Sequence, residues 1–185
     1  MPTEKPSPLR AIAAGAVCGI AATLVMDQFL KLASSGQKAL EKQEKLAHGE
    51  SPWLIAHEQV EQQQKAAQKE DSTEIVARNL AEAAGYYLPE DQRKSAGRAV
   101  HYTFGTLMGV VFAVAAEYFP QITTGAGLPY GTLLFLLADE VAVPALHLSP
   151  PPTETPASNH LQHWAAHLVY GSSLELLRSL TRRSF

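Results

Sequence analysis

The sequence predicts an all-α fold: a four-helix transmembrane bundle with a polar, largely helical insertion between its first two helices. Four apolar segments, 9–33, 99–119, 128–148 and 160–180, each approach the roughly 20 residues that an α-helix needs to cross a bilayer. Residues 35–97 instead hold eight of the 15 basic and eleven of the 18 acidic residues. Glycine pairs four residues apart occur in the first two apolar segments, and such pairs favour close helix contacts in membranes.

The first apolar segment contains an uncharged run over residues 11–26. A cleaved signal peptide would need small residues at its cleavage site, but Met, Asp, Gln and Phe occupy positions 26–29. We therefore predict an uncleaved membrane helix over 9–33, with an Ala/Gly-rich helix of a soluble core as the alternative. Gly15 and Gly19 mark the face of this helix where a second helix packs.

The polar insertion, 35–97, is rich in Gln, Lys, Glu and Ala, which are good helix formers. Gly49 and Pro52 separate two helical stretches, and Pro89 is expected to end the second one. The charges of this region predict a solvated surface.

The second span, 99–119, carries the other glycine pair, Gly105 and Gly109. Together the two glycine pairs predict tight helix packing, and they leave open a homodimer or a partner subunit in a larger membrane complex.

Four spans place both ends of the chain on one side of the membrane. Basic residues flank both ends, and loops longer than about 60 residues largely escape the rule that positive loops stay inside. We therefore predict that both termini are cytoplasmic. The basic residues at the two ends are Lys5, Arg10, Arg178, Arg182 and Arg183.

Composition and motifs exclude several functional classes. A net charge of -3, a pI near 6.2 and the absence of a basic patch speak against a nucleic-acid partner. The single cysteine, Cys18, cannot form an internal disulfide. No phosphate-binding glycine loop, Gly-x-Ser-x-Gly sequence or Cys–His nucleophile pair is present, so no motif supports a hydrolase or a nucleotide-dependent enzyme.

Ionisable residues within the apolar segments mark the candidate site, because charge is costly in a bilayer. Asp139 and Glu140 lie near the middle of the third segment, and Pro144 cannot donate to the Glu140 carbonyl. Neighbouring helix positions diverge by about 100°, so one carboxylate is expected to face the fourth segment while the other points elsewhere. His167, deepest of the histidines in that segment, is the preferred partner, with Tyr170 one turn further in.

Three functional interpretations compete with a purely structural contact; the weakest, haem held between His101 and His167, has no specific support in the sequence. A buried His–carboxylate cluster of His167 with Asp139 or Glu140 can respond to protonation, because histidine titrates near neutral pH. Alternatively, His160, His163, His167 and Glu140 offer imidazole and carboxylate ligands for zinc or iron, although their spacing matches no strong metal motif.

Three short motifs resemble the YagU-like bacterial inner-membrane proteins, a family of unknown molecular function: "FAVAAEYFP" (112–120), "VPALHLSPP" (143–151) and "HLVYGSSLELLR" (167–178). The resemblance covers about residues 100–180. It implies a polytopic inner-membrane protein with cytoplasmic termini and a loose link to survival under acid stress. The motif residues carried over are Glu117, Pro120, Pro144, Pro150, Pro151, His167, Glu175 and Arg178. His160 and His163 fall outside the pattern, and position 139 is not required to be Asp.

Glu175 and Arg178 lie three residues apart and are expected to form a structural ion pair on the fourth helix. The preferred function is that of a non-enzymatic inner-membrane protein contributing to acid or envelope homeostasis. The alternatives are a metal-binding membrane enzyme or carrier and a small subunit of a membrane complex.

Overall fold

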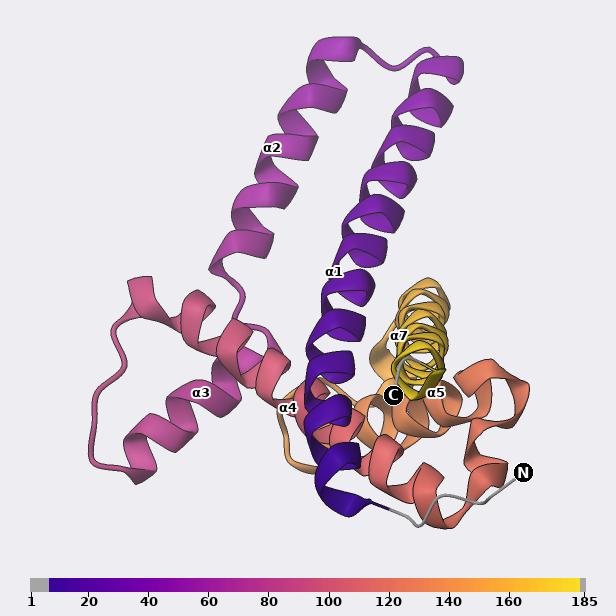
Figure 1. Cartoon of the computed structure of the whole chain (residues 1–185). Coiled ribbons are helices and arrows are strands. Elements are labelled where there is room, and N and C mark those ends of the chain that lie inside the picture. Colours follow the sequence, from indigo (N-terminus) through magenta and orange to yellow (C-terminus); the bar gives the residue numbers. More distant parts are fainter. Residues whose placement is uncertain (1–6, 184–185) are drawn as a thin grey trace.

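The computed structural model describes residues 7–183, and every regular element in this range is helical (Figure 1). The main helices are α1 (Pro8–Ala47), α2 (Pro52–Gln68), α3 (Ser72–Ala83), α4 (Glu90–Tyr118), α5 (Leu128–Phe135) and α7 (Ala157–Arg183). The shorter elements are η1 (Pro120–Gly127), the π-helix η2 (Leu136–Ala142), α6 (Val143–Ala145) and η3 (Pro152–Glu154). The prediction of an all-α fold is confirmed for the described residues.

Three helical stretches among residues 7–183 are long and apolar enough to cross a membrane: Pro8–Ala47, Glu90–Tyr118 and Pro120–Ala145. They correspond to the first three predicted spans. Helix α7 contains the fourth predicted span. At 27 residues it is long enough to cross a membrane, but it is less apolar than the three stretches above and does not belong with them.

Helices α1 and α4 pack through the two predicted glycine pairs. A Cβ atom added to Gly15 would lie 2.7 Å from the Gly109 carbonyl oxygen, and one added to Gly19 would lie 2.8 Å from that of Gly105. The helices run antiparallel, because the earlier glycine on α1 meets the later one on α4. These four glycines therefore pack against one another within one chain.

Helices α5 and α7 form a second close contact, which the sequence analysis missed. Gly127 and Gly131 approach the α7 backbone, and Gly171 approaches Gly127 and Gly131 in return. The buried side chains between the two helix pairs include Phe112 and Tyr170, which are almost inaccessible to solvent. Glycine faces thus bring four helices around one core.

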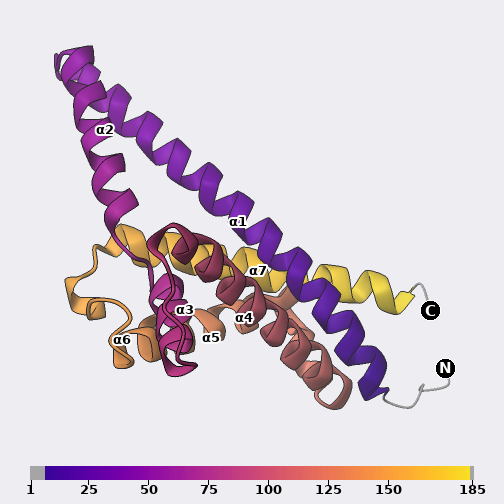
Figure 2. The ribbon, with the colours of Figure 1, turned by 90° about the vertical axis from the view of Figure 1, so that its left-hand side faces the viewer.

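The polar insertion differs from the prediction in its boundaries. Helix α1 does not end near residue 33 but continues to Ala47, because residues 37–47 are all good helix formers and the weaker positions 34–36 are few. Together with α2 it forms an arm that projects from the bundle (Figures 1 and 2). The break between α1 and α2 lies where Gly49 takes a positive φ of 83°, as predicted.

The second predicted helix of the insertion is split into α2 and α3. Asp71 begins α3 by accepting a hydrogen bond from the backbone N–H of Glu74 at 2.9 Å. Helix α3 ends at Ala83, and Gly85 turns the chain with a φ of 77°. Pro89 therefore does not end this helix; it precedes the first turn of α4.

Candidate functional site: paired histidines and carboxylates

The carboxylates of Asp139 and Glu140 lie on a π-helix rather than on the expected α-helix. Pro144 explains this local structure, because a proline ring collides with the carbonyl four residues earlier in an α-helix and has no N–H to donate. The wider π turn is closed by a bond from the N–H of Val143 to the carbonyl of Ala138. Such widened turns recur at functional sites.

Both carboxylates face α7, which corrects the expectation that only one would do so. Asp139 contacts His163 and His167, whereas Glu140 contacts His160. The π-helix turns less per residue than an α-helix, so neighbouring side chains diverge less. Each carboxylate consequently reaches a different turn of α7.

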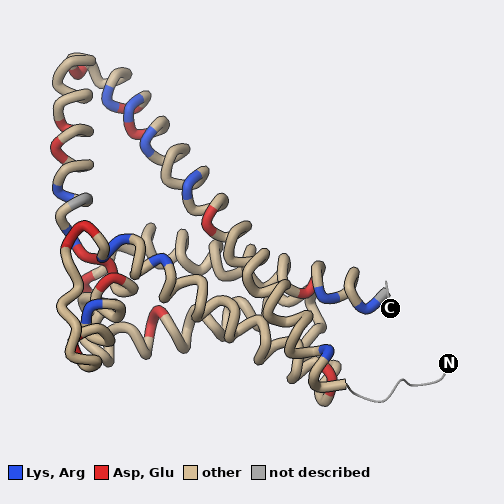
Figure 3. The backbone as a smooth tube through the Cα atoms, turned by 60° about the vertical axis from the view of Figure 1, so that its left-hand side comes forward, with Lys and Arg blue, Asp and Glu red and all other residues tan. Residues whose placement is uncertain are grey.

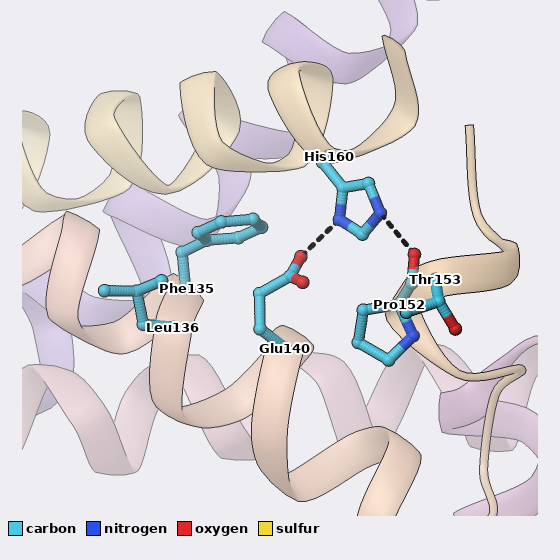
Figure 4. Close-up of a pocket in the computed structure, with 6 residues that line it drawn as sticks. All are labelled: Phe135, Leu136, Glu140, Pro152, Thr153 and His160. Carbon is cyan, nitrogen blue, oxygen red and sulfur yellow. Dashed lines mark hydrogen bonds and ion pairs between the residues drawn. The ribbon is translucent and has the colours of Figure 1, made fainter. Parts of the chain in front are cut away.

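His160 lies between two oxygen acceptors (Figure 4). Its Nδ1 is 2.5 Å from Oε1 of Glu140, and its Nε2 is 3.0 Å from the carbonyl oxygen of Pro152. A carbonyl can only accept, so Nε2 carries a hydrogen. Nδ1 then donates to an ionised Glu140, or accepts from a protonated one. In either case the pair holds one proton more than a neutral imidazole beside a carboxylate.

Asp139 joins two histidines less tightly. Its Oδ2 lies 3.1 Å from Nδ1 of His163 and 3.8 Å from Nδ1 of His167. His167 is only 6% exposed, and its Nδ1–H donates to the carbonyl of His163 at 2.9 Å. That bond fixes the tautomer with a hydrogen on Nδ1. The predicted contact of His167 with a carboxylate, at 3.8 Å to Asp139, is therefore longer than its hydrogen bond to His163.

Tyr170 is buried but is not joined to the cluster by a hydrogen bond. Its hydroxyl donates to the carbonyl of Gly105 at 2.6 Å and so ties α7 to the glycine face of α4. The structure thus gives Tyr170 a packing contact.

A third His–carboxylate pair lies between α1 and α4, and the sequence analysis did not select it. Nε2 of His101 is 3.2 Å from Oδ1 of Asp27, and the Tyr102 hydroxyl donates to Oδ2 of Asp27 at 2.9 Å. Asp27 and His101 both lie in apolar segments, where the cost of charge in a bilayer marks them as candidates, but nothing in the sequence indicates that they pair.

The histidines do not converge as metal ligands would. Among residues 7–183, no group of three or more His, Cys, Asp or Glu side chains is arranged to hold a metal ion. His160 turns to Glu140 and His163 turns to Asp139, so the four residues considered for zinc or iron form separate pairs.

The opposite end of the bundle carries a second group of charges. Arg178 makes a two-fold contact with Glu175, with Nε to Oε2 at 2.7 Å and Nη2 to Oε1 at 2.9 Å, as the sequence predicts. Glu117 lies at the same end, 3.9 Å from Arg182. On α4, 16 residues separate His101 from Glu117, which corresponds to about 24 Å of helix.

The comparisons with known proteins agree with this membrane character. The Escherichia coli (strain K12) protein named "Inner membrane protein YagU" is 32% identical over 78 residues, which are 42% of this chain and 38% of that relative. The aligned part thus spans less than two thirds of the relative's length. No solved structure matches the chain. The inner-membrane relative and the three apolar helices support a location in the inner membrane.

The family match extends further towards the N-terminus than the resemblance did. A family described as "Protein of unknown function (DUF1440)" matches residues 61–176, and so includes the end of α2, α3 and the polar start of α4. The matched region covers more than half of the 185 residues. The chain therefore belongs to the DUF1440 family of membrane proteins of unknown function.

Proposed function

We propose that this protein is a proton-responsive inner-membrane protein whose paired histidines and carboxylates contribute to acid or envelope homeostasis. The observation that carries the proposal is the position of His160 between two acceptors. Losing the shared proton leaves one of these two bonds without its hydrogen. Because Glu140 belongs to η2 and Pro152 begins η3, protonation of this pair controls how both elements are held against α7.

The distribution of side chains on α7 supports a fourth membrane span. Its buried face carries His167 and Arg178, whereas its exposed face carries Leu161 and Leu176. An outward apolar face with inward polar groups is what lipid surroundings demand of a spanning helix. The mean hydropathy of α7 is low in part because polar residues such as His167 and Arg178 lie on its buried face.

The proposed orientation places both termini in the cytoplasm. The start of α1 and the end of α7 lie at the same end of the bundle (Figure 2). Arg10, Arg178 and Arg182 belong to this end, in line with the enrichment of positive charge on the cytoplasmic side; Lys5 lies outside the described residues. The His–carboxylate pairs then lie towards the opposite, periplasmic side.

The test uses Glu140→Gln, because glutamine imitates the protonated carboxylic acid. Its amide can donate to Nδ1 of a neutral His160 while Nε2–H still bonds Pro152. We expect the unfolding temperature of the purified protein in detergent to change less between pH 5.5 and pH 8 in this variant than in the wild type. His48→Gln serves as the control, since His48 is exposed at the far end of α1.

An identical pH dependence in the wild type and in Glu140→Gln contradicts the proposal. The cellular test compares acid survival of bacteria whose only copy is the wild type or Glu140→Gln. Equal survival, together with equal protein levels, separates a structural pair from a responsive one.

A further inference from the structure

A cleft with charges of both signs lies outside the apolar part of the bundle, where the end of α2 and the starts of α3 and α4 meet. We call it the charged cleft; its volume is about 550 Å³, and its lining includes Lys69, Glu70, Glu74, Glu90, Arg93 and Lys94. Figure 3 shows acidic and basic residues crowding together in this part of the chain. None of these residues belongs to the His–carboxylate pairs.

A fixed framework holds the charged cleft open. Glu70 bonds Nη1 of Arg93 at 2.8 Å and lies 3.4 Å from Nε of Arg78, so it ties α3 to α4. Gly97 lets the two helices meet closely, because a Cβ there would lie 2.9 Å from the backbone nitrogen of Glu74. The side chain of Glu74 is thereby held at this junction.

Glu74 is the unexplained group of the charged cleft. The residue is only 8% exposed, and its carboxylate accepts no hydrogen bond from any residue in the described range. Burial, with a further contribution from Asp71, raises the pKa of Glu74 above its ordinary value. An ionised carboxylate in such a place keeps only part of its hydration, so a hydrogen-bond donor from outside the chain would stabilise it.

Cations of the same cleft lack close partners too. The ammonium groups of Lys69 and Lys94 form no ion pair or hydrogen bond with another described residue, although Lys94 acts on Glu74 at longer range. A simple cation in the charged cleft would be repelled by these lysines, and a simple anion would be repelled by Glu74 and Glu90. A metal ion is not favoured either, because no three ligating side chains converge within residues 7–183.

We propose that the charged cleft binds a small zwitterion, whose ammonium group bonds Glu74 and whose phosphate or carboxylate group lies against Lys69 and Lys94. Two sources carry this chemistry: the phosphoethanolamine headgroup of a membrane lipid, and a free zwitterion such as an amino acid. The cleft suits either source, since α4 continues from it directly into its apolar segment.

The test titrates the full-length protein in detergent with glycerophosphoethanolamine and measures the dissociation constant by calorimetry. We expect saturable binding that weakens at least ten-fold in Glu74→Gln and stays unchanged in Glu44→Gln, an exposed site on the arm. Ethanolamine alone and phosphate alone should each bind at least ten-fold more weakly than the whole zwitterion. Glu74→Gln removes an isolated buried charge, so the variant is expected to fold.

Two further experiments identify the source of the ligand. A lipid source predicts that nanodiscs containing phosphatidylethanolamine compete with the soluble probe, whereas nanodiscs of phosphatidylglycerol do not. A free source predicts that glycine binds and that neither lipid competes. The proposal is overturned if neither glycerophosphoethanolamine nor glycine binds, if ethanolamine binds as tightly as the zwitterion, or if Glu44→Gln weakens binding as much as Glu74→Gln.

Discussion

The glycine contact between α1 and α4 gives the sharpest prediction of stability. A Cβ atom at position 109 would lie 2.5 Å from the carbonyl oxygen of Gly15 and 2.6 Å from Cα of Gly19. Ordinary van der Waals contacts begin near 3.4 Å, so the helices would have to separate by about 0.9 Å. Backbone atoms cannot rotate away as a side chain can, and the separation would open the whole interface.

Gly109→Ala is therefore expected to destabilise the protein, although alanine is the better helix former. Overpacking of a tight interface typically costs about 1–3 kcal/mol, against a helix-propensity gain of about 1 kcal/mol in water. Gly36→Ala is the matched control, because a Cβ at this helical position meets nothing within 4 Å. The control should gain stability through propensity alone.

The assay is thermal unfolding followed by circular dichroism in one detergent, with the oligomeric state measured in parallel. From highest to lowest, the expected order of unfolding temperature is Gly36→Ala, wild type and Gly109→Ala. If Gly109→Ala matches or exceeds the wild type while Gly36→Ala gains, the close α1–α4 contact is wrong. If Gly109→Ala dissociates a dimer instead, the glycine face serves a second copy.

Three further predictions concern single side chains. Tyr170→Phe leaves the buried Gly105 carbonyl without its donor and should lower the free energy of unfolding by about 1–3 kcal/mol, measured by denaturant titration. Glu175→Gln leaves Arg178, which is 8% exposed, as an uncompensated buried cation; a loss of about 3–5 kcal/mol is expected, and an unchanged unfolding midpoint would contradict the pairing. Glu74→Gln should raise the unfolding temperature at pH 7. The raised pKa of Glu74 means that its contribution to stability is full below pH about 4.5 and is lost as the pH rises through the folded-state value, so the advantage of glutamine must vanish in acid.

The apolar segments and glycine spacing predicted much of the fold, because both reflect local chemistry. Glycines four residues apart on one helix predict a close contact, and their pairing across α1 and α4 follows from an antiparallel arrangement. The contact of α5 with α7 was not predicted: Gly127 and Gly131 are four residues apart, but Gly127 lies just before the third apolar segment, and Gly171 has no glycine four residues away on its own helix. Helix ends in the polar insertion escaped prediction because strong helix formers run past residue 33.

The sequence predicted which residues make up the candidate site, but not which histidine pairs with which carboxylate. Sequence position favoured His167 as the partner of a carboxylate, whereas the shortest contact joins His160 to Glu140. The difference arises from the π-helix, which the sequence signals only through Pro144. Without that widened turn, an α-helical register would turn one of the two carboxylates away from α7.

The position of these pairs along the bundle accounts for the low hydropathy of α7. His101 and Glu117 lie about 24 Å apart on α4, a little less than the roughly 30 Å of a hydrocarbon core. Helix α7 places His160 beside one layer and Arg178 in the other, with His167 turned inward between them. The least exposed polar residues of α7, His167 and Arg178, face the core, where Arg178 pairs with Glu175, whereas the His163 side chain is largely exposed. In the proposed four-span arrangement, the inward polar groups of α7 lower its mean hydropathy without contacting lipid, while Leu161, Leu176 and Leu180 lie on its exposed face.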